Sequence, residues 1–115
     1  MLIRIVKLTF KEESMKFFFS EFDKNKFQIT NFKGCRGMRM LQDMKQKNVL
    51  MTYSHWDDEN ALDNYRNSEV FLRLWNKIKP HFKYKPEAWS HEVYFDGFNI
   101  SRDESENGLS STIET

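Results

Sequence analysis

The stretch GCRGMRMLQDMKQKNVLMTYSHWDDENALDNYRNSEVF, residues 34–71, decides the fold of this chain. After the opening glycines, residues 37–43 carry methionines at alternating positions. Residues 44–48 are polar and separate this run from a second β-rich run at residues 49–56. Two such runs joined by a short polar segment are typical of a hairpin, so both are predicted to be adjacent antiparallel strands.

The second half of the stretch carries the signals of two helix starts. Asp57, which is followed by further acids, is predicted to cap one helix, and Ser68 is predicted to cap the next. Behind Ser68, apolar side chains recur at helical spacing: Val70, Phe71, Leu74, Trp75 and Ile78. Pro80 should end or kink this second helix, because proline lacks the backbone N–H and its ring clashes with the preceding turn.

Upstream of residue 34, the period of the apolar residues changes once. Residues 2–10 mix β-branched and aromatic side chains with Arg4 and are largely apolar on both faces, which predicts a strand covered on both sides. Residues 12–26 then place one apolar stripe at helical intervals: Met15, Phe18, Phe19 and Phe22. Residues 27–32 fit either a last helical turn or a packed loop that leads to Gly34.

Downstream, residues 81–86 are predicted to be a connector and residues 88–95 a fourth strand. The order of strand, helix, two strands, two helices and strand predicts an α+β fold, the ferredoxin-like split βαβ sandwich with a four-stranded antiparallel sheet. We expect this domain to span residues 1–95. Residues 96–115 form a polar, acidic C-terminal tail, expected to be flexible unless it docks on a neighbouring subunit.

A sheet with helices on one face only leaves its other face bare. The predicted strands offer little purely polar side to water, since both alternating faces carry apolar residues. A second sheet that covers the bare face would remove this exposed apolar surface. The sequence therefore predicts a homodimer formed through the open sheet face.

The amino-acid composition limits the classes of molecule that the chain is expected to bind. The chain has 115 residues, enough for one domain, and 11 Phe, 4 Tyr and 3 Trp give it more apolar surface than a small core easily hides. A ligand cavity and a subunit interface both fit this surplus. The net charge of +1 argues against nucleic acid or an anionic membrane as a partner.

The sequence also indicates the cellular compartment of the protein and the role of its cysteine. No run approaches the roughly 20 apolar residues of a membrane span. The N-terminal apolar stretch contains bases and is typical of a strand rather than a secretory signal, so a cytoplasmic location is expected. The single cysteine, Cys35, excludes an internal disulfide and a multi-cysteine metal site, and fits a small buried residue at a turn better than a nucleophile.

Three histidines are the candidates for acid–base chemistry. His55 and His91 both fall on predicted strands, and either could act as a catalytic base on an acidic phenol. The alternative is a structural or solvent-facing role, which is the more common one. His81 follows Pro80 in a connector and is a weaker candidate, and the spacing of the three matches no metal motif.

Aromatic side chains are the candidates for a substrate pocket between the helices and the sheet. We select Tyr65, Trp75 and Trp89, because aromatic rings stack on planar ligands. Trp56 is a weaker candidate, since its place at a strand end suits packing. Core packing is the alternative for each of them.

The whole pattern resembles the antibiotic biosynthesis monooxygenase (ABM) family, whose members are dimeric α/β barrels. The resemblance covers residues 1–95 and rests on short motifs: Gly34-Cys35-Arg36-Gly37 before a strand, Trp56 at a strand end, Ala61, and Ser68-Glu69-Val70-Phe71 at a helix start. These motifs identify the scaffold rather than a reaction.

The resemblance also implies what chemistry to expect. Some relatives oxidise aromatic substrates with oxygen and no cofactor, and others degrade haem with an Asn, a Trp and an axial His at positions that fall here on Val6, Tyr65 and Trp75. Haem degradation is disfavoured, because an indole cannot ligate haem iron as an imidazole does. We expect a cofactor-independent monooxygenase for a small aromatic or quinol-like substrate. The alternatives are a non-catalytic small-molecule-binding dimer and, less favoured, a haem binder that uses another histidine.

Overall fold

The computed structural model describes residues 1–98. The elements in chain order are β1 (Leu2–Phe10), the 3-10 turn η1 (Glu12–Ser14), α1 (Met15–Thr30), β2 (Cys35–Gln42), β3 (Val49–Trp56), α2 (Glu59–Arg66), α3 (Glu69–Ile78), the 3-10 turn η2 (Lys79–His81) and β4 (Phe82–Glu92). Most of the tail predicted for residues 96–115 lies outside the described residues. The boundary at residue 95 therefore stays a prediction.

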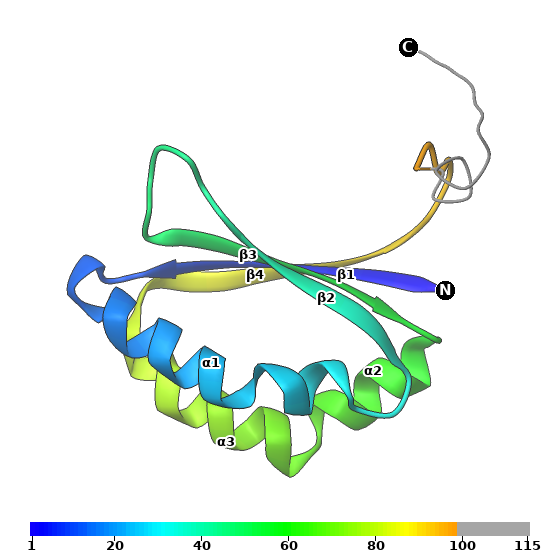
Figure 1. The fold of residues 1–115 in the computed structure, drawn as a ribbon, viewed down its shortest axis with the longest axis horizontal. Coiled ribbons are helices and arrows are strands. Elements are labelled where there is room, and N and C mark those ends of the chain that lie inside the picture. The colour runs from blue at the N-terminus through cyan, green and yellow to red at the C-terminus, as the bar shows by residue number, and fades with distance from the viewer. Residues whose placement is uncertain (99–115) are drawn as a thin grey trace.

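The four strands form one antiparallel sheet in the order β2-β3-β1-β4. Figure 1 shows α1, α2 and α3 on one side of this sheet and the other side without a helix. This is the predicted ferredoxin-like α+β arrangement. It places β1, the first strand in sequence, in the interior of the sheet and leaves β2 and β4 at the edges.

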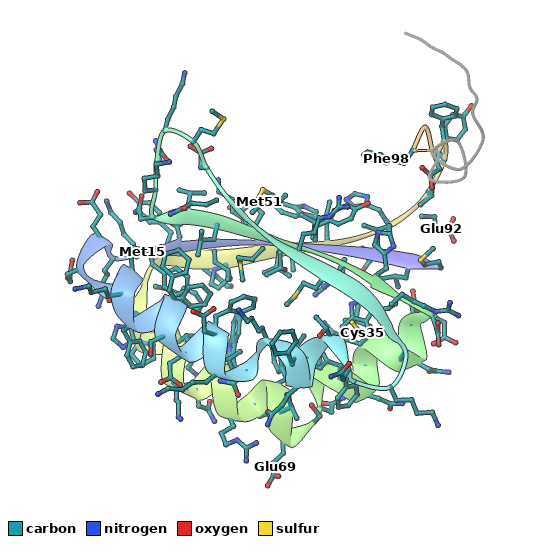
Figure 2. The ribbon with its side chains drawn as sticks, in the orientation of Figure 1. Met15, Cys35, Met51, Glu69, Glu92 and Phe98 are labelled. Atoms are coloured by element: carbon teal, nitrogen blue, oxygen red, sulfur yellow. The ribbon has the colours of Figure 1, made fainter. Side chains whose placement is uncertain are left out.

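The pairing register sorts the sheet residues onto two faces. Paired residues of an antiparallel sheet point to the same side, and neighbours along a strand point to opposite sides. Arg4, paired with Ser54, belongs to the helix-covered face, whereas Ile5, paired with Trp89, belongs to the uncovered one. We call the uncovered side the open face, formed by Ile3, Ile5, Lys7, Arg39, Leu41, Met51, Tyr53, His55, Glu87, Trp89 and His91. In Figure 2, Met51 lies on this side, away from the helices.

The core fills the space between the sheet and the helices. Its largest fully buried side chains are Phe10, Phe18, Leu50 and Trp56. The rings of Phe10 and Phe18 have centroids 4.4 Å apart and join β1 to α1. The whole predicted stripe of α1 packs on this core: Met15, Phe18, Phe19 and Phe22. The helical periodicity therefore predicted the buried side of α1 correctly.

Gly34 explains why the fold-deciding stretch begins with a glycine. Its φ angle of +89° is one that residues with a side chain rarely adopt. A Cβ at Gly34 would overlap the Cβ of Ala61 in α2, so the turn and the helix touch directly. The carbonyl of Gly34 also accepts a hydrogen bond of 2.9 Å from the backbone N–H of Asp57. The motif thus connects the start of β2 to the end of β3.

The cap of α3 was predicted correctly and the cap of α2 was displaced by one residue. The Ser68 hydroxyl accepts a hydrogen bond of 3.2 Å from the N–H of Phe71. In α2 the cap is Asp58, whose carboxylate accepts a hydrogen bond of 2.9 Å from the N–H of Ala61. Asp57 instead forms an ion pair with Arg36, because the Gly34 contact holds its backbone against the turn.

The fourth strand begins earlier and ends earlier than predicted. It runs over Phe82–Glu92 rather than 88–95 and includes Pro86. A proline is tolerated there because β4 is an edge strand, and its register against β1 shifts next to Pro86. The strand ends at Glu92 because this residue pairs with Leu2, the first residue of β1. Of the ambiguous residues 27–32, residues 27–30 form the last helical turn of α1, and Asn31 and Phe32 begin the loop that leads to Gly34.

Candidate functional site

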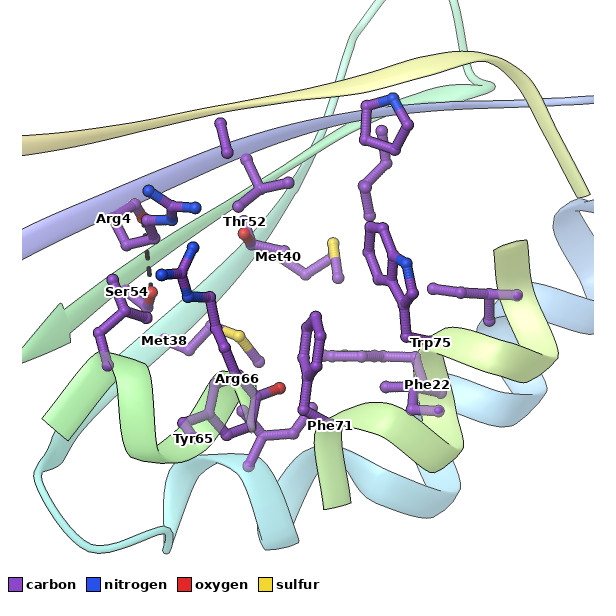
Figure 3. A pocket seen from close by; sticks show the side chains of 18 of the residues that line it. Arg4, Phe22, Met38, Met40, Thr52, Ser54, Tyr65, Arg66, Phe71 and Trp75 are labelled. Atoms are coloured by element: carbon purple, nitrogen blue, oxygen red, sulfur yellow. Dashed lines mark hydrogen bonds between the residues drawn. The ribbon is translucent and has the colours of Figure 1, made fainter. Parts of the chain in front are cut away.

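A cavity of about 520 Å³ lies between the helices and the covered face of the sheet. Figure 3 shows that the strands supply one wall and the helices the other. Apolar side chains dominate the lining, with Val6, Met38 and Met40 from the strands and Phe71, Leu74 and Trp75 from α3. A volume of this size lies within the range of small-molecule sites, which are mostly apolar with a few polar groups.

A continuous series of aromatic contacts runs along the helical wall, from Trp56 at the end of β3 to Phe82 at the start of β4. The ring of Tyr65 stacks on Trp56 with centroids 4.9 Å apart and meets Phe71 edge-on at 5.2 Å. Phe71 in turn stacks on Trp75 at 5.3 Å, and Trp75 contacts Phe82 at 5.3 Å. Each of these contacts stabilises the others by fixing ring orientation, so the wall is preorganised for a flat ligand.

Tyr65 brings a phenol to the cavity. Burial raises the pKa of its hydroxyl, and a thiolate at the nearby Cys35 would raise it further. Burial likewise raises the pKa of the Cys35 thiol. Tyr65 is therefore a neutral hydrogen-bond donor at ordinary pH.

This shift gives a prediction about stability. A phenol that holds its proton more tightly when folded stabilises the fold below the ordinary tyrosine pKa of about 10, and this stabilisation is lost as the pH rises above that value. The free energy of unfolding should therefore decrease less for Tyr65→Phe than for the wild type as the pH rises from about 9 to about 11. Urea unfolding at a series of pH values measures this. Tyr84→Phe, at a side chain that is 63% exposed, is the matched control, and identical slopes for wild type and Tyr65→Phe would contradict the prediction.

Two arginines lie at one end of the cavity. In Figure 3, the guanidinium groups of Arg4 from β1 and Arg66 from the end of α2 face the same space. Arg4 donates a hydrogen bond of 2.9 Å to the Ser90 hydroxyl, and Arg66 forms an ion pair of 2.7 Å with Asp63. Burial, and next the positive charge of Arg66, lower the pKa of Arg4, while Asp63 offsets part of that effect.

The serine and threonine next to this end complete its polar side. Ser54 accepts a hydrogen bond of 2.9 Å from the indole N–H of Trp56 and lies 3.4 Å from the carbonyl of Arg4, to which its hydroxyl donates. Thr52 lies two residues before Ser54 on the same face of β3. Most polar groups of the cavity thus lie on β1, β3 and the junction of α2 with α3, and β4 adds Lys85.

Of the predicted pocket residues, the structure brings Tyr65 and Trp75 together and places Trp89 elsewhere. Tyr65 and Trp75 both line the cavity. Trp89 pairs with Ile5 on the open face and is 40% exposed. The physical reason is the alternation of β4: Ala88 points into the cavity, so its neighbour Trp89 points to the other side of the sheet.

The predicted catalytic histidines are also outside the cavity. His55 and His91 pair with Ile3 from either side, so they lie in one row on the open face, roughly 10 Å apart across two strand spacings. His55 contacts the ring of Tyr53 with centroids 5.1 Å apart. Their role as bases stays a prediction, and it would have to act at the open face rather than in the cavity. His81 has a packing role, since its ring is 2.7 Å from the Ser14 hydroxyl and stacks on Phe17.

No Asp, Glu or His is among the cavity-lining residues of the described chain. The titratable groups there are Arg4, Tyr65, Arg66 and Lys85. Within residues 1–98, no group of three or more His, Cys, Asp or Glu side chains is arranged to hold a metal ion. In the same part of the chain, no helix is both long and apolar enough to cross a membrane.

Sequence reasoning did not select Arg4, Arg66 or Phe71. A signal for Arg4 was present, because the sequence predicted a strand covered on both faces, where a charged side chain needs a polar partner or a ligand. Arg66 carried no such signal, since a basic residue in the last turn of a helix is ordinary. Phe71 was assigned to the apolar face of its helix, and the structure shows that this face borders the cavity.

Comparison with known families settles the class of this scaffold. The model of the family described as antibiotic biosynthesis monooxygenase matches residues 1–77. The chain belongs to the ABM family. The comparison with curated proteins gave no significant match.

Solved structures agree with this assignment at the level of the fold. An antibiotic biosynthesis monooxygenase is 20% identical with a TM-score of 0.77, and the match covers 81% of this chain and 98% of that chain. A conserved protein from Methanosarcina mazei Go1 is 21% identical with a TM-score of 0.73, covering 78% and 90%. A protein from Mycobacterium tuberculosis is 12% identical with a TM-score of 0.76, covering 84% and 98%.

Membership of the ABM family gives the cavity a further meaning. The positions matched above to the haem-degrading relatives are Val6, Tyr65 and Trp75, and all three line the cavity. In this ABM protein those positions hold an aliphatic side chain, a phenol and an indole. The three positions that the resemblance singles out thus share one cavity, and none of them holds an imidazole or an amide.

Proposed function

We propose that this ABM protein is a cofactor-independent monooxygenase that oxidises a small aromatic or quinol-like substrate with O₂. The observation that carries the proposal is the aromatic-walled cavity of about 520 Å³ between the helices and the sheet. Trp75 and Phe71 would stack on the substrate ring, and the neutral hydroxyl of Tyr65 would donate a hydrogen bond to a substrate oxygen.

The reaction is balanced without an added reductant. An ionised quinol transfers one electron to O₂, and the resulting radical pair recombines to form a bond between a ring carbon and oxygen. The hydroperoxide then loses water to give a hydroxyquinone, so quinol and O₂ yield hydroxyquinone and H₂O. The quinol supplies all four electrons, and the protein supplies a mostly apolar cavity that orients the ring.

Oxygen uptake with a panel of quinols and phenols tests this function. We expect Trp75→Ala to lower kcat/KM by about tenfold or more, because it removes the stacking surface, and Trp75→Phe to restore most of the activity. Leu72→Ala, on the exposed side of the same helix, is the matched control. Absence of oxygen uptake with every member of the panel would favour the alternative, a binding protein that has kept the scaffold without the chemistry.

The same assay decides the role of the histidines. If His55 or His91 were the base, His55→Gln or His91→Gln would abolish an imidazole-like limb of the pH profile of kcat/KM. The placement of the cavity favours a profile that follows the ionisation of the substrate instead, and that moves when the substrate is replaced by a more acidic phenol. A profile independent of the substrate would support the histidines.

We also propose that the protein is a homodimer whose two open faces pack together. The open face is rich in large side chains, including Ile5, Met51, Tyr53 and Trp89. Figure 1 shows the β2–β3 hairpin and residues 93–98 rising at opposite ends of this face, so that the two flank it. In a two-fold dimer, the hairpin of one copy would meet residues 93–98 of the other, where Tyr94 and Phe95 are exposed.

A further inference from the structure

Two positive charges meet at one end of a cavity that is otherwise mostly apolar. Arg4 reaches that end from the interior strand β1, and Arg66 reaches it from the last residue of α2. Figure 3 shows both guanidinium groups there, next to Thr52 and Ser54. Placing two cations side by side costs free energy unless a negative charge lies between or beside them.

The protein compensates these charges only in part. Asp63 pairs with Arg66 at 2.7 Å, on the exposed side of α2, and Arg4 bonds to a neutral hydroxyl, that of Ser90. The other titratable groups that line the cavity are Lys85 and Tyr65, neither of which brings a negative charge at ordinary pH. An arginine is also suited to this task, since its guanidinium group stays positively charged and offers several N–H donors to an anionic oxygen.

We propose that Arg4 and Arg66 bind the anionic oxygen of the substrate, which makes the ligand class of this cavity an ionised, planar aromatic compound, a phenolate. The inference rests on the proposed function for the identity of the site. The flat ring lies against Phe71 and Trp75, and the oxygen anion lies at the arginine end. The polar and apolar parts of the cavity thus match the two parts of one ligand.

The two arginines also replace a catalytic base, because they promote ionisation of the bound substrate. Neighbouring cations stabilise a phenolate relative to the phenol, so the bound substrate becomes a stronger acid and loses its proton to water or buffer. No carboxylate or imidazole is needed in the cavity, in agreement with their absence from its lining within residues 1–98. The ionised ring is the species that can give an electron to O₂.

The test uses a coloured nitronaphthol, whose phenolate absorbs visible light, and its methyl ether, which cannot ionise. We expect the wild type to bind the phenolate about tenfold or more tightly than the ether, and a spectrophotometric pH titration to show a correspondingly stronger acid in the bound state. Arg4→Gln and Arg66→Gln should each reduce this preference severalfold and leave binding of the ether unchanged. Arg4→Lys should retain part of it.

Arg73→Gln is the matched control, because Arg73 lies on α3 outside the cavity and is 4.0 Å from Glu69. It removes one positive charge from the protein and should leave the preference intact. Equal binding of phenolate and ether by the wild type would overturn the inference, as would a preference that survives both cavity substitutions. Because no oxygen chemistry enters this measurement, preference for the phenolate without oxygen uptake would support the anion site while contradicting the monooxygenase.

Discussion

Gly34→Ala should destabilise the protein by about 3 kcal/mol, a large part of the 5–15 kcal/mol typical of a domain. Two effects add. The backbone at Gly34 has φ of +89°, where a side chain costs about 1–2 kcal/mol. The new Cβ would also overlap that of Ala61, so the turn or α2 must shift, at about 1–3 kcal/mol for overpacking. Urea unfolding at a fixed protein concentration measures the loss.

Two controls separate these effects. Gly37 also has a positive φ, +142°, but a Cβ there would meet no atom within 4 Å, so Gly37→Ala isolates the backbone strain. Ala61→Gly should cost about 1 kcal/mol by itself because glycine weakens a helix. Combined with Gly34→Ala it should nevertheless recover the steric part, so the double variant would be less destabilised than the sum of the two. Additive effects would show that the contact with Ala61 does not limit the turn.

Trp89→Glu should convert the proposed homodimer into a folded monomer. Trp89 is 40% exposed in the single chain, so a glutamate there remains in water when the chain is alone. Within a two-fold interface the substitution buries two unpaired charges, one per copy, and we expect the dimer dissociation constant to rise about 100-fold or more. Light scattering and sedimentation over a range of concentrations measure this change, and circular dichroism confirms that the monomer is folded.

Leu72→Glu is the matched control for that experiment. Leu72 is 46% exposed and lies on α3, on the helical side of the sheet, so it introduces the same charge at similar exposure away from the open face. It should leave the dimer intact. A wild type that is monomeric at micromolar concentration, or a Trp89→Glu variant as dimeric as Leu72→Glu, would exclude the open face as the interface.

The fold was predictable because its signals are local. The helical stripe that begins at Met15, the hairpin pattern and the Ser68 cap each depend on a few neighbouring residues, and the structure confirms them. The predictions were wrong where a contact between residues far apart in the sequence determines the local structure. Asp57 lost the capping role to Asp58 because Gly34 holds its backbone, and Pro86 is accepted in β4 because that strand has only one neighbour.

The site was less predictable for a related reason. Tyr65 and Trp75 lie on a helical wall whose period can be read from the sequence, and both line the cavity. Trp89 and the strand histidines required the strand register, which sets the side of the sheet that each residue faces. Arg4 and Arg66 are 62 residues apart in sequence and meet only through the packing of α2 against the sheet. Their joint role therefore becomes visible only in three dimensions.

The period of two along β1 has a consequence for how this protein can diverge. Arg4 and Val6 face the cavity, while Ile3 and Ile5 face the open side, although all four are consecutive in sequence. Substitutions at even positions can alter the cavity without changing the open face, and substitutions at odd positions can alter the open face without changing the cavity. Insertion of one residue in this strand would exchange the two sets at once. Substitutions in β1 can therefore change one face of the sheet at a time. An insertion of one residue changes both faces together, so we expect selection to remove it.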